Sequence, residues 1–279
     1  MITCKQFPDK TFTSKEEVFA ELRTNAAKII TLKKAQIQKS YMKGGNTVSF
    51  LDPARIDSAA MKVGPQMKDG YIYPVINTTN YLDSHDDVHF PPIWDRTVKD
   101  QAGKIYYVTN HDLEIGDIIA WPEQVTMMLK SVPWSFVGKD YAGSTQALMF
   151  EIKKDGITHV EAKDIIDNKR QVQNSVRMQY VTVKLAMDSS NKDDVTYKQY
   201  WDSRIDQIAN KEEAMEQSYF FGVEEAKIIN EGSMVIKGSN DATPIRQKDE
   251  ADTITSEHKD EPVIPTTQTK QFFINPNLF

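Results

Sequence analysis

Cysteine is almost absent from this sequence. The 279 residues include a single cysteine, Cys4, so no disulfide can form within the chain, and a reducing compartment fits this composition. The sequence also lacks any run approaching the ~20 apolar residues of a membrane span. No apolar run follows Lys5, as a signal peptide would require. We therefore expect a soluble, intracellular protein with no membrane partner.

Positive charge is not in excess either. Lysine and arginine number 34 against 40 acidic residues, and the net charge of −6 does not indicate a surface that binds nucleic acid. The sequence contains no phosphate-binding glycine loop, no Cys/His zinc pattern and no internal repeat. It therefore predicts neither a metal nor an organic cofactor. The apolar content of 39% is enough for one sizeable core with appendages.

Composition divides the chain into three regions. Residues 1–63 are predicted to form a helical extension and linker, and residues 64–237 contain the strand patterns of a core domain. Residues 238–279 are rich in acids and poor in large apolar side chains, which is typical of a disordered tail. The last residues, 272–279, turn apolar again and are either a frayed end or a short docking peptide.

Periodicity predicts the main elements. Ser14-Lys-Glu-Glu17 has the spacing of a capping box, and apolar residues at helical spacing follow it, which predicts a helix from about Ser14 to Lys39. Alternating apolar residues predict strands at about 70–79, 104–112, 145–153, 175–187 and 226–236. Further helices are predicted at about 122–133, 160–169 and 192–217.

Carboxylates and imidazoles crowd together at Asp83, His85, Asp86, Asp87 and His89. Such groups are metal ligands in many proteins, so a metal site is one interpretation. Their spacing matches no metal motif, and the neighbouring prolines argue against a helix that would bring the histidines onto one face. We favour the alternative, a polar turn in which aspartate side chains accept hydrogen bonds from backbone amides.

Three other polar residues lie at or near strand ends. Ser175 has the same parity as the apolar row of its predicted strand, which places its hydroxyl on the core side at the strand mouth. His111 ends a strand in the same way. Glu231 lies on an apolar strand face, where a carboxylate is costly unless it is paired, although it could equally face outward. Serine needs an adjacent base to attack a carbonyl, and a carboxylate commonly orients that base.

Several segments, taken in order, resemble the tailed-phage prohead maturation serine proteases, which are similar to the herpesvirus assemblins. They cover about two thirds of the chain together with the residues between them, and they are 77–94, 110–116, 174–180, 205–214, 225–229, 231–235 and 238–244. The resemblance implies an α+β, β-rich fold: a mostly antiparallel β-barrel flanked by helices. It implies a serine endopeptidase that needs no cofactor.

The same resemblance assigns roles to residues. His111 matches the family histidine and Ser175 the nucleophile. Glu231 matches the acidic position before the last strand, and Glu225 is a rival for that third role. Relatives carry glycine where this chain has Arg177, which either supplies a guanidinium to the oxyanion or marks a weakened copy.

The implied partners are the scaffold and the major capsid protein as substrates, together with other copies of this chain. The implied location is the host bacterial cytoplasm, inside the immature head. Two other functions compete with the protease. One is a non-catalytic head-assembly protein that keeps the fold, and the other is a metal-dependent hydrolase built on Asp83, His85, Asp87 and His89.

Overall fold

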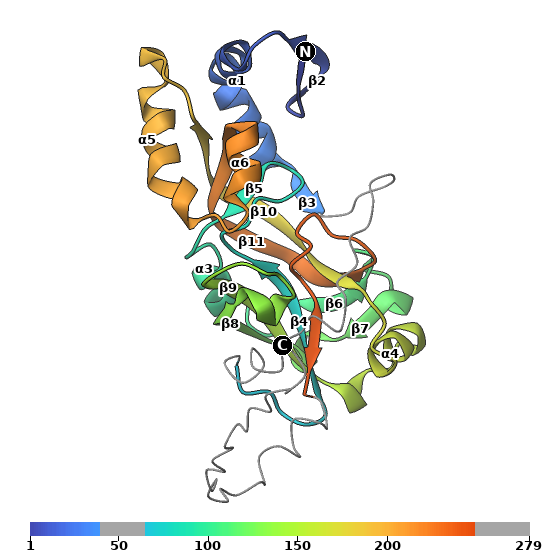
Figure 1. Ribbon diagram of the computed structural model, residues 1–279. Helices are drawn as coiled ribbons and strands as arrows, with labels where there is room; N and C mark the ends of the chain where they lie inside the picture. The colour runs from blue at the N-terminus through green and yellow to red at the C-terminus, as the bar shows by residue number, and fades with distance from the viewer. Residues whose placement is uncertain (40–64, 249–279) are drawn as a thin grey trace, which may run out of the picture. The chain divides into compact units, whose positions relative to one another are not determined.

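Two long antiparallel strands, β10 (Gln173–Met187) and β11 (Tyr219–Val235), lie side by side in the larger sheet (Figure 1). The structure is a computed structural model, and it describes residues 1–39 and 65–248. The sheet continues from β10 to β3 and from β11 to β6 and then β7, and β5 also pairs with β11. The smaller strands are β3 (Ile37–Lys39), β5 (Asp87–His89), β6 (Tyr106–Thr109) and β7 (Ile118–Ala120).

A second sheet has the strand order β12-β4-β9-β8, and all its pairs are antiparallel. Its strands are β4 (Tyr71–Thr78), β8 (Thr126–Pro133), β9 (Ser144–Lys153) and β12 (Ile245–Gln247). Successive residues of β9 belong to different buried clusters: Leu148 and Phe150 to the main core, Ala147 and Met149 to a second one. Both faces of this sheet are therefore buried.

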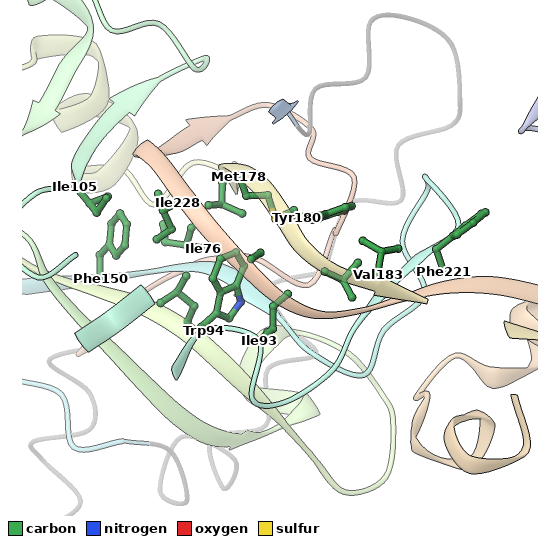
Figure 2. Close-up of a cluster of buried hydrophobic side chains, with 14 of the residues drawn as sticks. Ile76, Ile93, Trp94, Ile105, Phe150, Met178, Tyr180, Val183, Phe221 and Ile228 are labelled. Carbon is green, nitrogen blue, oxygen red and sulfur yellow. The ribbon is translucent and has the colours of Figure 1, made fainter. Parts of the chain in front are cut away.

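Gly232 of β11 packs closely against the second sheet. A Cβ atom placed on Gly232 would lie 2.7 Å from Phe150 of β9 and 3.2 Å from Ile76 of β4. Figure 2 shows Phe150 and Ile76 within the cluster of buried side chains that the two sheets share. Glycine is needed here because any side chain would push the sheets apart.

The first helix, α1 (Lys15–Ala35), packs on this same core. It buries Val18, Phe19, Leu22, Ala26 and Ile29, which belong to one cluster with the residues of β10. The expected N-cap is present, since Ser14 Oγ accepts a hydrogen bond from the Glu17 amide at 3.3 Å. The helix ends before Lys39 because residues 37–39 form β3 against β10. The hairpin of β1 (Ile2–Cys4) and β2 (Phe7–Phe12) precedes it.

The other helices within the described residues are short. They are α3 (Asp95–Asp100), α4 (Val160–Asp167), α5 (Val195–Arg204) and α6 (Lys211–Gln217). Single 3-10 turns are η2 (Ile115–Asp117), η3 (Pro122–Gln124), η4 (Trp134–Val137), η5 (Lys154–Gly156), η6 (Lys192–Asp194) and η7 (Ile205–Gln207). The segment expected as one helix at 192–217 is thus divided between α5 and α6.

The α+β class is confirmed, and antiparallel pairs predominate. The closed barrel is wrong: the strands within 1–39 and 65–248 form three separate sheets, of which the smallest is the β1–β2 hairpin. A barrel needs its first and last strands to pair. Here β3 and β7 are the edge strands of one sheet, and β12 and β8 are the edge strands of another. Strand β11 also pairs in parallel with β5 and with β6.

The helix expected at 122–133 is also wrong, because only η3 is helical and β8 follows it. Met127 and Leu129 pack against the main core, whereas Met128 packs against the second one. A strand that contacts a different core on each face carries apolar residues at many positions, and some of these coincide with helical spacing.

Residues 238–248, assigned by composition to the tail, are part of the folded structure. They include β12 and the buried side chains of Asn240 and Thr243. The rest of that predicted tail, 249–279, and most of the predicted linker, 40–64, lie outside the described residues. Among the residues that the structure describes, no helix is both long and apolar enough to span a membrane.

Candidate active site

A tight turn after β6 places His111 beside the start of β10 and the end of β11. Asn110 and His111 both adopt left-handed backbone conformations, with φ of 50° and 61°. Two hydrogen bonds fix this turn: the Asn110 amide donates to Met234 O at 2.9 Å, and the His111 amide donates to Ser233 Oγ at 2.9 Å. Strained backbone held in this way is common at functional sites.

The His111 side chain lies between Ser175 and Glu231. Its Nδ1 is 2.8 Å from Glu231 Oε1, and its Nε2 is 3.0 Å from Ser175 Oγ. An ionised carboxylate only accepts hydrogen bonds, so Nδ1 carries the proton and Nε2 is left to accept the serine hydroxyl. The structure therefore brings together the three residues that the sequence pointed to, in the order serine, histidine, carboxylate.

The pairing of β10 with β11 explains this convergence. Ser175 is directly opposite Ser233, so the two side chains share a face of the sheet, and Glu231 precedes Ser233 by two residues on that face. Between Val176 and Met178 the register on β11 jumps from Gly232 to Ile228. This bulge leaves Glu231 unpaired with β10, and β-bulges commonly re-aim side chains beside active sites.

Ser175 lies near the start of its strand, as predicted, but its side chain does not lie on the face that the alternation predicted. A register irregularity between Tyr180 and Val183 reverses the alternation of β10. Near the serine the core residues are Val176, Met178 and Tyr180, and beyond the irregularity they are Val183, Leu185 and Met187. Ser175 therefore lies on the face opposite the core row, because a strand that gains one residue exchanges its two faces.

The site is almost closed to solvent. The exposed fractions are 3% for Ser175, 2% for His111 and 0% for Glu231. Glu231 Oε2 is buried and has no hydrogen-bond partner. A hydrogen bond from a charged group gains strength in such surroundings, because few solvent dipoles compete with it.

Sequence reasoning missed the residues that support the serine. Asn174 Oδ1 accepts a hydrogen bond from Tyr107 at 2.6 Å, and the Asn174 amide donates to Thr243 O at 2.9 Å. Thr243 in turn donates from its hydroxyl to Asn174 O at 2.7 Å. Ser233 could have been found, because it shares parity with Glu231 on a predicted strand. Composition assigned Thr243 to the tail, although 238–244 is one of the segments that carry the resemblance.

Glu225, the rival for the third role, is not brought to His111. Its carboxylate is 3.4 Å from Arg96 Nη1 and is partly exposed. Arg177 lies two residues beyond Ser175 on β10, and its Nε is buried with no hydrogen-bond partner.

The Asp83–His89 segment forms a polar turn and a buried network. Asp83 Oδ1 accepts hydrogen bonds from the amides of His85 and Asp87 at 2.8 and 3.0 Å, as the turn interpretation expects. Asp87 is bound by Lys33 at 2.6 Å and by the Tyr180 hydroxyl at 2.9 Å. These contacts use the aspartates as structural acceptors.

His89 extends this network towards the second sheet. Its Nε2 lies 3.3 Å from the Tyr180 hydroxyl, and its Nδ1 lies 2.9 Å from Asn77 Nδ2. Asn77 Oδ1 accepts a hydrogen bond from Trp94 Nε1 at 2.9 Å. Burial lowers the pKa of His89 to about 4 and raises the pKa of Asp87 to about 6. A neutral His89 can make both of its hydrogen bonds in this network, to Tyr180 and to Asn77.

The described part of the chain contains no group of three or more His, Cys, Asp or Glu side chains arranged to hold a metal ion. Comparison with protein-family profiles, with curated proteins and with solved structures finds no match to this chain. Its function has to be inferred from the residues and their geometry.

Proposed function

We propose that this chain is a serine endopeptidase in which His111 activates Ser175 and Glu231 orients His111. The observation that carries the proposal is the pair of hydrogen bonds on one imidazole, 3.0 Å to Ser175 Oγ and 2.8 Å to Glu231 Oε1. Both distances lie within the range that direct proton transfer and orientation require. Three residues that are distant in the sequence would rarely meet in this order without a catalytic use.

The chemistry would follow the usual course of acyl transfer. His111 Nε2 takes the Ser175 proton while Oγ attacks the scissile carbonyl carbon, and Glu231 stabilises the imidazolium. The tetrahedral intermediate collapses as Nε2 returns the proton to the leaving amine, which gives an acyl-enzyme. Water, deprotonated by His111, then releases the acid product and restores Ser175. Backbone amides beside Ser175, or a guanidinium, would hold the oxyanion.

The resemblance of the sequence to prohead maturation proteases suggests the substrates. We propose that the enzyme cleaves scaffold and major capsid protein, and other copies of itself, inside an immature phage head in the bacterial cytoplasm. Self-association belongs to the same proposal. Neither a metal nor an organic cofactor enters the chemistry described above.

The test is co-expression of the full chain with the cognate capsid protein. We expect discrete cleavage products with the unaltered chain and none with Ser175→Ala. Purified protein should also react with a serine-directed fluorophosphonate, and Ser175→Ala should not. Identical cuts from Ser175→Ala would refute the nucleophile assignment.

A second candidate function is a non-catalytic head-assembly protein. It is favoured by the 3% exposure of Ser175 and by Arg177, which replaces the family's glycine. Full-length protein that assembles with capsid protein but never reacts with the fluorophosphonate would support it. The metal-dependent hydrolase is less well supported, because Lys33 and Tyr180 already occupy Asp87. Stoichiometric zinc or manganese in purified protein would revive it.

A further inference from the structure

Asn174, the residue before Ser175, joins segments that are distant in the sequence. The Tyr107 hydroxyl donates to Asn174 Oδ1 at 2.6 Å, and Asn174 Nδ2 donates to Thr243 O at 2.8 Å. All three residues are buried. Because solvent competes little for these hydrogen bonds, they hold the side-chain amide of Asn174 in one orientation.

Thr243 also fixes the backbone of Asn174. The Asn174 amide donates to Thr243 O at 2.9 Å, and the Thr243 hydroxyl donates to Asn174 O at 2.7 Å. On its other side Asn174 lies opposite Met234 of β11. Thr243 therefore takes the place of a neighbouring strand, because it binds both backbone groups of Asn174 as a strand partner would. Its hydroxyl binds the carbonyl of the peptide bond that leads into Ser175.

The segment that contains Thr243 is anchored to the second sheet. The next residue, Pro244, accepts a hydrogen bond at its carbonyl from the Val75 amide of β4 at 2.9 Å. The Asn240 side chain donates to Thr78 O of the same strand at 3.1 Å. The start of β10 is therefore held by the second sheet as well as by β11.

This second support matters because the ladder between β10 and β11 is short at this point. Four residue pairs, 173–176 opposite 232–235, precede the bulge at which the register jumps. On its other edge, β10 pairs with β3 only beyond Val176 in the described part of the chain. Strand ends with few ladder bonds open easily, so the bonds of Asn174 restrict the movement of this end.

Tyr107 connects the same arrangement with His111. It lies on β6, and the turn that carries His111 follows this strand. Strand β11 lies between β6 and β10, so the Tyr107 side chain crosses β11 to reach Asn174. One hydrogen bond therefore links the strand before His111 to the residue before Ser175.

We propose that the bonds of Asn174 to Tyr107 and Thr243 position the serine for catalysis. They hold Ser175 Oγ within hydrogen-bonding reach of His111 Nε2, at the observed 3.0 Å. The inference rests on the proposed function and adds positioning residues to it, which act through the backbone before Ser175. Displacing a reacting group by about 1 Å can lower the rate about 10²-fold.

The test removes single hydroxyl groups and keeps the shape of the side chain. Thr243→Val deletes the bond to Asn174 O. Thr97→Val is the matched control, because Thr97 is also buried and its hydroxyl donates to a backbone carbonyl, Ala226 O of β11, at 2.7 Å. Each variant loses one bond of the same kind and length, so their Tm values should agree within about 3 °C.

The kinetic constants separate positioning from general destabilisation. Thr243→Val should lower kcat for peptide hydrolysis about 10²-fold with KM within about twofold, and should slow labelling by the fluorophosphonate to a similar extent. Thr243→Ser, which restores the hydroxyl, should recover most of the loss. Thr97→Val should stay within about threefold of the unaltered chain. Equal losses in the two valine variants, or no rescue by serine, would overturn the inference.

A double variant tests the shared link through Asn174. Tyr107→Phe deletes only the hydroxyl that binds Asn174 and should lower kcat about tenfold. Because both hydroxyls act on the same residue, Tyr107→Phe/Thr243→Val should stay within about threefold of Thr243→Val. Losses that multiply would mean that the two residues act independently, against the inference.

Crystal structures of the full chain distinguish this inference from the proposed function. In Thr243→Val the distance from Ser175 Oγ to His111 Nε2 should exceed about 3.5 Å, whereas Thr97→Val should leave it unchanged. An unchanged distance in Thr243→Val, in a chain that cleaves peptides, defeats the inference and leaves the peptidase intact. The expected displacement, in a chain that neither cleaves nor reacts with the fluorophosphonate, defeats the peptidase alone.

Discussion

At the scale of single residues, His111 decides what the site can do. Its backbone is held by Ser233 and its ring by Glu231, so the nitrogen that faces Ser175 has a fixed orientation and tautomer. The sequence identified these side chains by type and by position at strand ends. It could not decide between Glu231 and Glu225, because periodicity does not show that a bulge turns one of them towards the imidazole and that Arg96 binds the other.

Replacing the orienting carboxylate tests this arrangement. Glu231→Gln should lower kcat/KM for peptide hydrolysis by about 10³- to 10⁴-fold, since a neutral amide neither fixes the tautomer nor stabilises the imidazolium. The matched control is Glu225→Gln, which should stay within about threefold of the unaltered chain because Glu225 lies at a partly exposed ion pair. A larger loss from Glu225→Gln than from Glu231→Gln would reverse the assignment.

Gly232 provides a second residue-scale prediction, this time for packing. Gly232→Ala should lower the free energy of unfolding by about 1–3 kcal/mol, because the new methyl group would overlap Phe150 and Ile76. Gly116→Ala is the control: its Cβ would meet nothing within 4 Å, and a change below about 0.5 kcal/mol is expected. Urea unfolding of the two variants gives both values. Equal stabilities would mean that the sheets have room to move apart.

At the scale of elements, the Asp83–His89 segment ties α1, β5 and β10 together through buried polar groups. Lys33 of α1 and Tyr180 of β10 both bind Asp87, and His89 continues the chain of bonds. The sequence predicted the turn from the local chemistry of aspartate. The sequence could not predict the network, because Lys33 and Tyr180 are far from Asp87 along the chain.

This network makes stability depend on pH in two opposite ways. Burial lowers the pKa of His89 from 6.5 to about 4. The contribution of His89 to the free energy of unfolding is therefore complete above pH 6.5 and is lost as the pH falls towards 4. Burial raises the pKa of Asp87 from 3.8 to about 6, so its contribution is present below pH 3.8 and is lost as the pH rises through 6. Between pH 4 and 6 the two slopes offset each other.

Replacing His89 should leave the pH dependence of stability that comes from Asp87 without its opposing contribution. In His89→Gln the free energy of unfolding should fall as the pH rises from 4.5 to 6.5, whereas the unaltered chain should change little. The difference between the two proteins should change by about 2 kcal/mol across this range, since a full titration step contributes about 1.4 kcal/mol per pH unit and the histidine is only partly titrated at both ends. Urea titrations at several pH values measure it. Parallel curves for the two proteins would contradict the lowered pKa of His89.

At the scale of the whole molecule, α1 belongs to the core that positions the site, although composition placed it in a separate extension. Leu22 is fully buried in the same cluster as Val176 and Met178 of β10, which follow Ser175. The stability of α1 and that of β10 are therefore coupled, because the two elements bury apolar surface against each other.

Leu22→Ala should accordingly destabilise the protein by about 2–5 kcal/mol and lower the temperature at which activity is lost. Leu32→Ala, on the same helix but 48% exposed, should cost less than about 0.5 kcal/mol. Thermal unfolding and residual hydrolysis, followed on the same samples, provide the comparison. If Leu22→Ala unfolded no earlier than Leu32→Ala, α1 would be a separate appendage after all.

The sequence by itself indicated the α+β class, the first helix with its cap, five of the strands, including the two longest, and the histidine and serine of the site, with two candidates for the carboxylate. The elements follow from local patterns of capping and alternation, whereas the class and the roles of the site residues were implied by the family resemblance. The three-dimensional structure alone decided that the sheets stay open, that residues 126–133 form a strand, and that Glu231 rather than Glu225 reaches His111. Those outcomes depend on pairing between distant segments and on bulges that exchange the faces of a strand, and no local window of sequence contains that information.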